Sequence, residues 1–387
     1  MISLTGTYPA SIALVFSIHQ QTRSTAWVSV SMILTFGVVG FFGPVAGAVS
    51  DRFDRRRVMI TGEVGAAAAW ALMVGVTEMP GLLLGLAFCA SLLESLFLPA
   101  SSAALPNLAG EDELARANSL IAMGRNAGLT IGPLVGGLLF AAVGSRGVFG
   151  LNAVSFVVAA ALVGGIHGRF ANPDRVSSGA ADRGGLASGI VFIVREPVLR
   201  QMLLSWVVFV LGTASTIVAE PLLADKFEAG ALGYGALTAF WGGGTILGAW
   251  LSRGVRRERE AVWIVSFSAL MALTCFGVAL SPSFWLILVW IAAFGLADGP
   301  TQVVEQNLLQ RLTPDHLRGR VMGAWEAAMT GAFVGALLLG GLVVGHVGPG
   351  GAFVFAGVMG LFGAALLLPL LRRLPHASPA QVPLAHL

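Results

Sequence analysis

The chain has 387 residues, of which 56% are hydrophobic and 11% are charged, against roughly 25% charged in an ordinary soluble domain. This composition excludes a water-soluble globule. The two cysteines and six scattered histidines offer neither a disulfide framework nor a clustered metal site, so we expect no metal and no cofactor. The sequence contains no HExxH, GxSxG or Walker A motif, which disfavours an enzyme.

Hydrophobic runs recur between charged breaks and breaks marked by glycine or proline, as in a many-helix membrane protein. With ~20 apolar residues per span, they predict twelve helices, at residues 2–19, 25–49, 58–76, 81–105, 119–143, 148–166, 203–223, 234–251, 262–280, 285–304, 321–344 and 351–371. The first of these carries no Lys or Arg before residue 19, so it lacks the basic region of a signal peptide and the usual cytoplasmic flank. This leaves open whether Met1 is the true start.

The basic residues are distributed unevenly over the predicted loops. Nineteen of the 23 fall on one set of alternate loops, and only Arg23, Arg146 and Lys226 fall on the other. Because cytoplasmic loops are enriched in Lys and Arg, we predict a multi-pass protein of the cytoplasmic (inner) membrane with both termini cytoplasmic. The formal charge of +3 then needs no nucleic-acid partner.

Two glycine patterns recur along the chain at nearly equal offsets. The pair at 43 and 47 returns 201 positions later, and the triplet at 128, 132 and 137 returns 203 positions later. The longest polar segment separates two sets of six helices and has the composition of a flexible linker, and we expect residues 186–199 at its end to form a short interfacial helix. The predicted domains are an N-terminal six-helix bundle (1–166), a cytoplasmic linker (167–201), a C-terminal six-helix bundle (202–371) and a cytoplasmic tail (372–387).

The loop after the second predicted helix carries a glycine, two aspartates and an arginine cluster. An aspartate near a helix N-terminus can accept hydrogen bonds and pair with arginine, which would make a latch between conformations. In the alternative interpretation the arginines only anchor the loop in the cytoplasm. The residues concerned are Gly47, Asp51, Arg52, Asp54, Arg55 and Arg56.

The fifth predicted helix carries a second motif, made of small residues around a proline. Glycines let helices approach closely, and Pro133 removes a backbone donor and bends the helix. Ordinary glycine-based packing is an equal alternative to a role in transport. The motif residues are Gly128, Gly132, Pro133, Gly136 and Gly137.

These two motifs resemble the loop signature of major facilitator transporters and the antiporter motif of their drug/proton exchangers. Segments 99–126, 195–200 and 318–323 are similar to the branch of the superfamily that contains enterobactin exporters and macrolide efflux proteins. The resemblance covers essentially the whole chain. It implies an all-α membrane protein with the major facilitator fold, in which twelve transmembrane helices form two six-helix repeats around a midplane site. Asp54 departs from the pattern, since the general signature has glycine there.

Ionisable residues inside the predicted spans need a reason, because each costs roughly 2.5–3.5 kcal/mol at the bilayer centre. Glu94, Glu220 and Asp298 lie deepest, and the resemblance places them on helices that line the central cavity. Since desolvation favours the neutral form of a carboxylate, we expect them to take up and release protons during transport. Alternatively, a neighbouring hydroxyl or Arg125 satisfies each carboxylate.

Arg125, Glu63 and Glu326 lie closer to the cytoplasmic helix ends, where they either reach the interface or complete the loop latch. Arg125 and Glu326 are also candidates for the proton or substrate pathway. The resemblance implies an arginine on the fourth helix, which this sequence lacks, and Arg125 on the fifth is the expected substitute. Trp241 and Trp325 also lie within spans, where packing is favoured over stacking on a ligand.

Together these features predict a monomeric, proton-coupled exporter of a small amphipathic compound, either a drug or a siderophore-like metabolite. Its partners would be the substrate, protons and the lipid bilayer. A lysolipid flippase or a nutrient symporter on the same fold remains the alternative. A membrane-embedded enzyme or a sensor is disfavoured, because the spans lack a catalytic cluster and the linker and tail are short.

Overall fold

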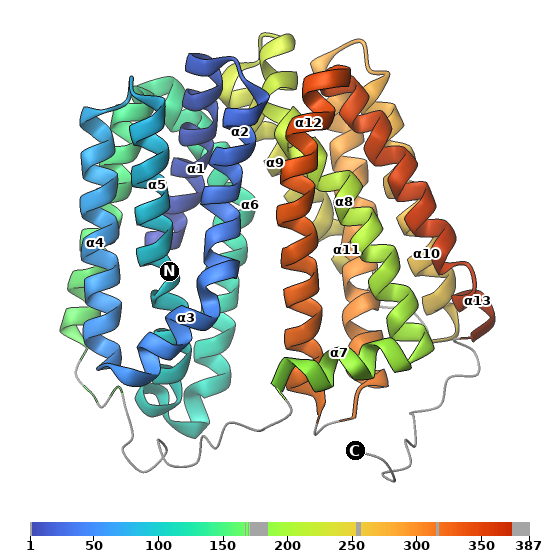
Figure 1. Ribbon diagram of the computed structural model, residues 1–387, viewed down its shortest axis with the longest axis horizontal. Helices are drawn as coiled ribbons and strands as arrows, with labels where there is room; N and C mark the ends of the chain where they lie inside the picture. Colours follow the sequence, from blue (N-terminus) through green and yellow to red (C-terminus); the bar gives the residue numbers. More distant parts are fainter. Residues whose placement is uncertain are drawn as a thin grey trace. The chain divides into compact units, whose positions relative to one another are not determined.

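The structure is a computed structural model that describes residues 2–166, 168, 170, 185–252, 257–314 and 317–373. Within these residues every regular element is a helix (Figure 1). By their packing the residues fall into two compact units. Unit 1 comprises Met1–Ala180 and Glu220–Ala239, and unit 2 comprises Ala181–Ala219 and Phe240–Leu387.

Unit 1 is built on two helices that pack along α6, namely α1 and α4. Its core includes the buried side chains of Leu14, Trp70, Met73 and Phe149. Its helices are α1 (Ile2–Thr22), α2 (Thr25–Met32), a π-helical turn (Ile33–Gly37), α3 (Val38–Arg52), α4 (Arg55–Gly75), α5 (Pro80–Ser95) and α6 (Phe97–Gly165).

Unit 2 is built around α10, which packs against both α11 and α12. Its core includes the buried side chains of Met202, Leu308, Val321 and Trp325. Its helices are α7 (Gly185–Arg195), α8 (Pro197–Lys226), α9 (Gly230–Leu251), α10 (Glu260–Ala279), α11 (Phe284–Leu312), α12 (Arg318–Leu367) and α13 (Leu370–Arg373), together with a 3-10 turn at Arg257–Arg259. The ends of α8 and α9 that meet at residues 220–239 belong to unit 1.

The two longest helices are broken by glycine in the same way. Gly144 in α6 has φ +66° and Gly348 in α12 has φ +72°, a region that residues with a Cβ rarely adopt. Another glycine follows three residues after each break. A Cβ on Gly147 would lie 2.5 Å from the side chain of Val143, and one on Gly351 would lie 2.6 Å from the side chain of Val347. The breaks lie 204 positions apart, close to the offsets of the glycine patterns, so the chain repeats a backbone geometry as well as a composition.

Among the described residues, seven helical stretches are long and apolar enough to cross a membrane: Arg55–Gly75, Pro80–Leu105, Ile131–Gly165, Pro197–Lys226, Arg257–Ala279, Phe284–Leu312 and Arg320–Arg373. Their number supports a multi-span membrane protein. At 1.5 Å per residue, the 69 residues of α6 would extend about 100 Å, so α6 holds more than one crossing of a ~30 Å hydrocarbon layer.

Several helix boundaries differ from the prediction. The segment 106–118, expected as a loop, is helical within α6. The short helix expected at 186–199 is present as α7 but ends at Arg195, and α8 starts at Pro197, before the expected residue 203. Pro197 explains the early start of α8, because proline is well tolerated in the first turn of a helix.

Candidate functional site

The arginine-rich loop ties the start of α4 to the ends of α6. Asp54 is the N-cap of α4, where its Oδ1 accepts a hydrogen bond of 2.9 Å from the Arg57 backbone N–H. Arg55 donates to the carbonyls of Ala103 and Phe170 at 2.9 and 3.3 Å. Asp54, which stands where the general signature has glycine, therefore caps α4 and satisfies one backbone N–H of its first turn.

The next arginine of this loop, Arg56, contacts the C-terminal end of α6. Arg56 donates to the Gly164 carbonyl and lies 5.7 Å from the ring centroid of Phe170. Arg52 is exposed, and a Cβ on Gly47 would meet nothing within 4 Å. Gly47 therefore makes no close helix approach among the described residues. The side chain of Asp51 lies outside the part of the chain that the structure describes.

The glycine motif of α6 is a packing surface with two partners. A Cβ on Gly132 would lie 2.7 Å from Cβ of Tyr8, and one on Gly136 would lie 2.6 Å from Cα of Pro9. These two glycines therefore seat α1 directly against α6.

The start of α9 contacts the same motif on another side. A Cβ on Gly137 would lie 2.6 Å from the carbonyl oxygen of Ala231, and one on Gly235 would meet the backbone of Pro133. Gly128 is buried in the same helix. The motif thus brings α1 and the start of α9 onto α6.

Glu94 on α5 faces α4 in unit 1. Its Oε1 accepts a hydrogen bond of 3.0 Å from the indole N–H of Trp70, and the hydroxyl of Thr7 on α1 bonds to it as well. Glu63 is buried on α4 and acts on Glu94 electrostatically. Glu94 is therefore held by neutral donors. The side chain of Arg125, the cation considered as its partner, lies beyond what the structure describes.

Asp298 on α11 is more deeply buried than Glu94 and Glu220, with 6% of its surface exposed. Its Oδ2 accepts hydrogen bonds from Trp241 Nε1 at 3.1 Å, Gln302 Nε2 at 2.9 Å and Thr245 Oγ1 at 3.5 Å. All three donors are neutral. Within the described residues, Asp298 has no ion-pair partner.

Glycines on both sides of Asp298 bring α11 against α9. Gly295 and Gly299 face the α9 backbone at Trp241 and Thr245, and Gly244 and Gly248 on α9 face the α11 backbone in turn. This reciprocal small-residue packing lets the two backbones meet. It places the donors of α9 within reach of the carboxylate.

Glu305 is within electrostatic range of both Asp298 and Glu326. Glu305, two turns further along α11, accepts a hydrogen bond of 2.8 Å from Trp325 Nε1 on α12. Glu326, the neighbour of Trp325, is exposed. The sequence interpretation missed Glu305 because the helix was expected to end at residue 304, and the longer hydrophilic continuation of α11 gave no periodic signal of a span.

Glu220 lies elsewhere, near the end of α8 and directly before Pro221. It is half-buried and close to the buried Tyr234 of α9. Of the three deep carboxylates, Glu94 on α5 and Glu220 in the packed segment of α8 belong to unit 1, and Asp298 on α11 belongs to unit 2.

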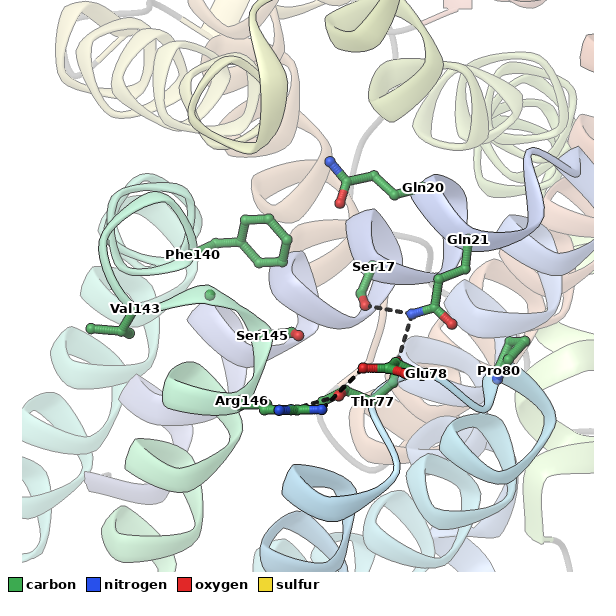
Figure 2. A pocket seen from close by; sticks show the side chains of 11 residues that line it. Ser17, Gln20, Gln21, Thr77, Glu78, Pro80, Phe140, Val143, Ser145 and Arg146 are labelled. Carbon is green, nitrogen blue, oxygen red and sulfur yellow. Dashed lines mark hydrogen bonds and ion pairs between the residues drawn. The ribbon is translucent and has the colours of Figure 1, made fainter.

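A cavity of about 620 Å³ opens in unit 1 beside the glycine break at Gly144. Figure 2 shows its polar wall, where Arg146 contacts Glu78 and Thr77 at 3.1 and 3.0 Å. Gln21 bonds to Ser17 in the same wall. None of the predicted carboxylates lines this cavity. Among the described residues, no group of three or more His, Cys, Asp or Glu side chains could hold a metal ion.

The fold has close counterparts among solved transporters. A bacterial homologue of the iron transporter ferroportin in an inward-facing state matches with a TM-score of 0.70 at 17% identity, over 97% of this chain and 96% of that one. A D-xylose–proton symporter matches with a TM-score of 0.66 at 14% identity, over 95% of both chains. At these identities the likeness establishes the major facilitator fold.

Curated relatives are similar over most of their length. The enterobactin exporter EntS of Shigella flexneri is 28% identical over 341 residues, which are 86% of this chain and 80% of that protein. The EntS of Escherichia coli O1:K1 / APEC is 29% identical over 342 residues, with the same shares. The family described as transmembrane secretion effector matches residues 1–387. The chain therefore belongs to this family of major facilitator transporters and is a membrane transporter, not an enzyme.

Proposed function

We propose that this protein is a proton-coupled exporter of a small amphipathic compound, a drug or a siderophore-like metabolite, working by alternating access. The relatives named as enterobactin exporters support export of a small molecule. The direction and the substrate class are carried over from these relatives.

The proposal includes twelve spans in two six-helix repeats, with bundles at 1–166 and 202–371 and both termini in the cytoplasm. The equivalent breaks at Gly144 and Gly348 support it, because each divides a long helix where a loop between two spans is predicted. The nineteen-to-three distribution of basic residues supports the orientation. The exporter works as a monomer in this proposal.

The observation that carries proton coupling is the environment of Asp298. Three neutral donors offset part of the cost of the buried charge of Asp298, but without a counter-ion among the described residues much of that cost remains, and binding a proton removes it. The Thr245 hydroxyl can donate to the charged form and accept from the neutral form, so the site suits both states. Protonation of Asp298 then changes the charge of the core of unit 2 without leaving a polar atom unsatisfied.

Glu94 plays the corresponding part in unit 1, held by Trp70 and Thr7. In the same proposal Glu220, Arg125 and Glu326 line the path of protons or substrate. The loop of Gly47, Asp51, Arg52, Asp54, Arg55 and Arg56 and the motif of Gly128, Gly132, Pro133, Gly136 and Gly137 support the conformational change.

Transport in inside-out vesicles tests the proposal. Export of a fluorescent amphipathic compound should require an imposed proton gradient and stop with a protonophore. Asp298→Asn and Glu94→Gln should each abolish the gradient-driven part at unchanged membrane abundance. Glu258→Gln, which removes an exposed acid in the 3-10 turn, is the matched control and should transport like the parent.

Unaltered gradient-driven transport in the double variant would reject the two carboxylates as coupling groups. Accumulation driven in the opposite direction would replace the exporter with the nutrient symporter. Movement of lysolipid alone, without any amphipathic solute, would replace it with the flippase.

A further inference from the structure

An exposed apolar ridge runs along the last part of α12 and onto α13, the short helix that follows it (Figure 1). Its side chains recur at helical spacing, while most of those between them are buried, so they form one face. The ridge consists of Val354, Val358, Leu361, Phe362, Leu368 and Leu371. It lies in a stretch that is long and apolar enough to cross a membrane, where lipid chains cover such a face.

Three exposed arginines lie where the ridge ends, and we call them the arginine corner. Arg372 and Arg373 are the last residues of α13, and Arg200 lies in the first turn of α8. Gln201 joins the two elements, because it donates to the carbonyl of Leu366 on α12 and accepts a hydrogen bond of 3.4 Å from Arg373 Nη1. As the neighbour of Gln201 in sequence, Arg200 therefore lies at the same end of unit 2 as the other two arginines.

The charges of the arginine corner are not taken up by carboxylates of the described part of the chain. No ion pair among these residues includes Arg200, Arg372 or Arg373. The acidic residue closest to them in sequence is the half-buried Glu196, one turn before Arg200. Arg200 uses one N–H on the carbonyl of Val194 at 3.2 Å. Since a guanidinium carries five N–H donors, the corner keeps donors and positive charge for an external anion.

We propose that the arginine corner and the ridge together bind an anionic phospholipid. The phosphate accepts hydrogen bonds from the guanidinium groups, whose planar forks match phosphate oxygens, and one acyl chain lies along the ridge. One leaflet of the ~30 Å hydrocarbon layer is about 15 Å deep, the length of about ten helical residues. The part of the ridge from Leu371 back to Leu361 therefore fits the chain of a lipid whose headgroup is at the corner.

The net charge of the headgroup decides which lipid is preferred. Phosphatidylcholine carries a phosphate and also a quaternary ammonium, so its net charge is zero and its cation approaches the arginines. Phosphatidylglycerol carries the phosphate alone. Each basic residue near an anionic membrane surface strengthens binding by roughly fivefold, which corresponds to about 1 kcal/mol. The three arginines should therefore favour phosphatidylglycerol at this position.

The test measures which lipid lies next to the ridge and needs no transport. A bimane label is attached to Leu368→Cys, an exposed position of the ridge, in the full chain with Cys89→Ser and Cys275→Ala. The chain is reconstituted in phosphatidylcholine vesicles that contain a fixed fraction of either brominated phosphatidylglycerol or brominated phosphatidylcholine. Quenching of the label gives the relative affinity of the two lipids. We expect phosphatidylglycerol to be preferred by at least about fivefold.

Variants and a second label position separate this site from the bulk bilayer. Arg372→Gln combined with Arg373→Gln should remove most of the preference, whereas lysine at both positions should keep most of it, because the charge remains. Arg146→Gln, which removes an exposed arginine of unit 1, should leave it unchanged. A label on Trp285→Cys, exposed in the first turn of α11, should show no preference in the parent chain.

Three results would overturn the lipid site: no preference in the parent chain, an equal preference at both label positions, or a preference unchanged in the glutamine variants. Inorganic phosphate that abolishes the preference at constant ionic strength would assign the corner to a soluble anion and overturn it too. Native mass spectrometry of the chain released from these vesicles checks the remaining occupant. A second copy seated on the ridge would appear as a dimer without bound lipid, and that result would also reject the proposal.

Discussion

Gly299→Ala should disable the carboxylate site of unit 2 without touching any of its polar atoms. Gly299 follows Asp298 directly and faces the α9 backbone. A Cβ there would lie 2.5 Å from the Ala249 nitrogen and closer still to the Thr245 carbonyl. Both neighbours are backbone atoms of a helix, so α9 and α11 must separate as bodies to make room.

The size of the effect follows from the distances. Contacts of a real Cβ under 3.0 Å essentially do not occur, so the helices must part by at least about 0.5 Å. If that shift reaches the neighbouring donor, the 3.1 Å between Trp241 Nε1 and Asp298 Oδ2 grows to about 3.6 Å, which is no longer a hydrogen bond. Overpacking of this kind costs roughly 1–3 kcal/mol.

Two measurements on Gly299→Ala check this reasoning, the apparent unfolding temperature in detergent and gradient-driven transport in proteoliposomes. Both should fall. Gly243→Ala is the matched control on α9, because a Cβ there would meet nothing within 4 Å, and it should behave like the parent. If Gly299→Ala matches Gly243→Ala in both measurements, the glycine contacts do not set the geometry of Asp298.

Two further predictions concern stability. Arg311→Met should lower the free energy of unfolding by about 3–5 kcal/mol. The Arg311 guanidinium pairs with both carboxylate oxygens of the buried Glu260, at 3.2 and 2.5 Å, and the variant leaves that carboxylate unpaired. An unchanged denaturation midpoint would contradict this. Gly348→Ala should lower the free energy of unfolding by about 1–3 kcal/mol, because φ +72° and ψ 176° suit glycine alone. Gly350→Ala is the control and should be close to neutral. Equal shifts of the unfolding temperature in the two variants would refute the argument from φ.

The positions of the buried carboxylates followed from hydropathy, but their partners did not. Asp298 stands out in sequence because a charge interrupts an apolar run. Its donor Trp241 is 57 positions away, and single-sequence periodicity carries no information about which helices pack together. We expected Trp241 and Trp325 mainly to pack, and the structure shows their indole N–H groups donating to Asp298 and Glu305.

The loop motif shows another limit of sequence reasoning. Asp54 looked like a departure from a signature, yet its side chain caps α4, a local role that a search for Asx residues before an apolar helix could have found. Gly47 belongs to the loop motif, and a Cβ on it would meet nothing within 4 Å among the described residues. A glycine in sequence signals either close approach or freedom of the backbone, and only the tertiary neighbours decide between them.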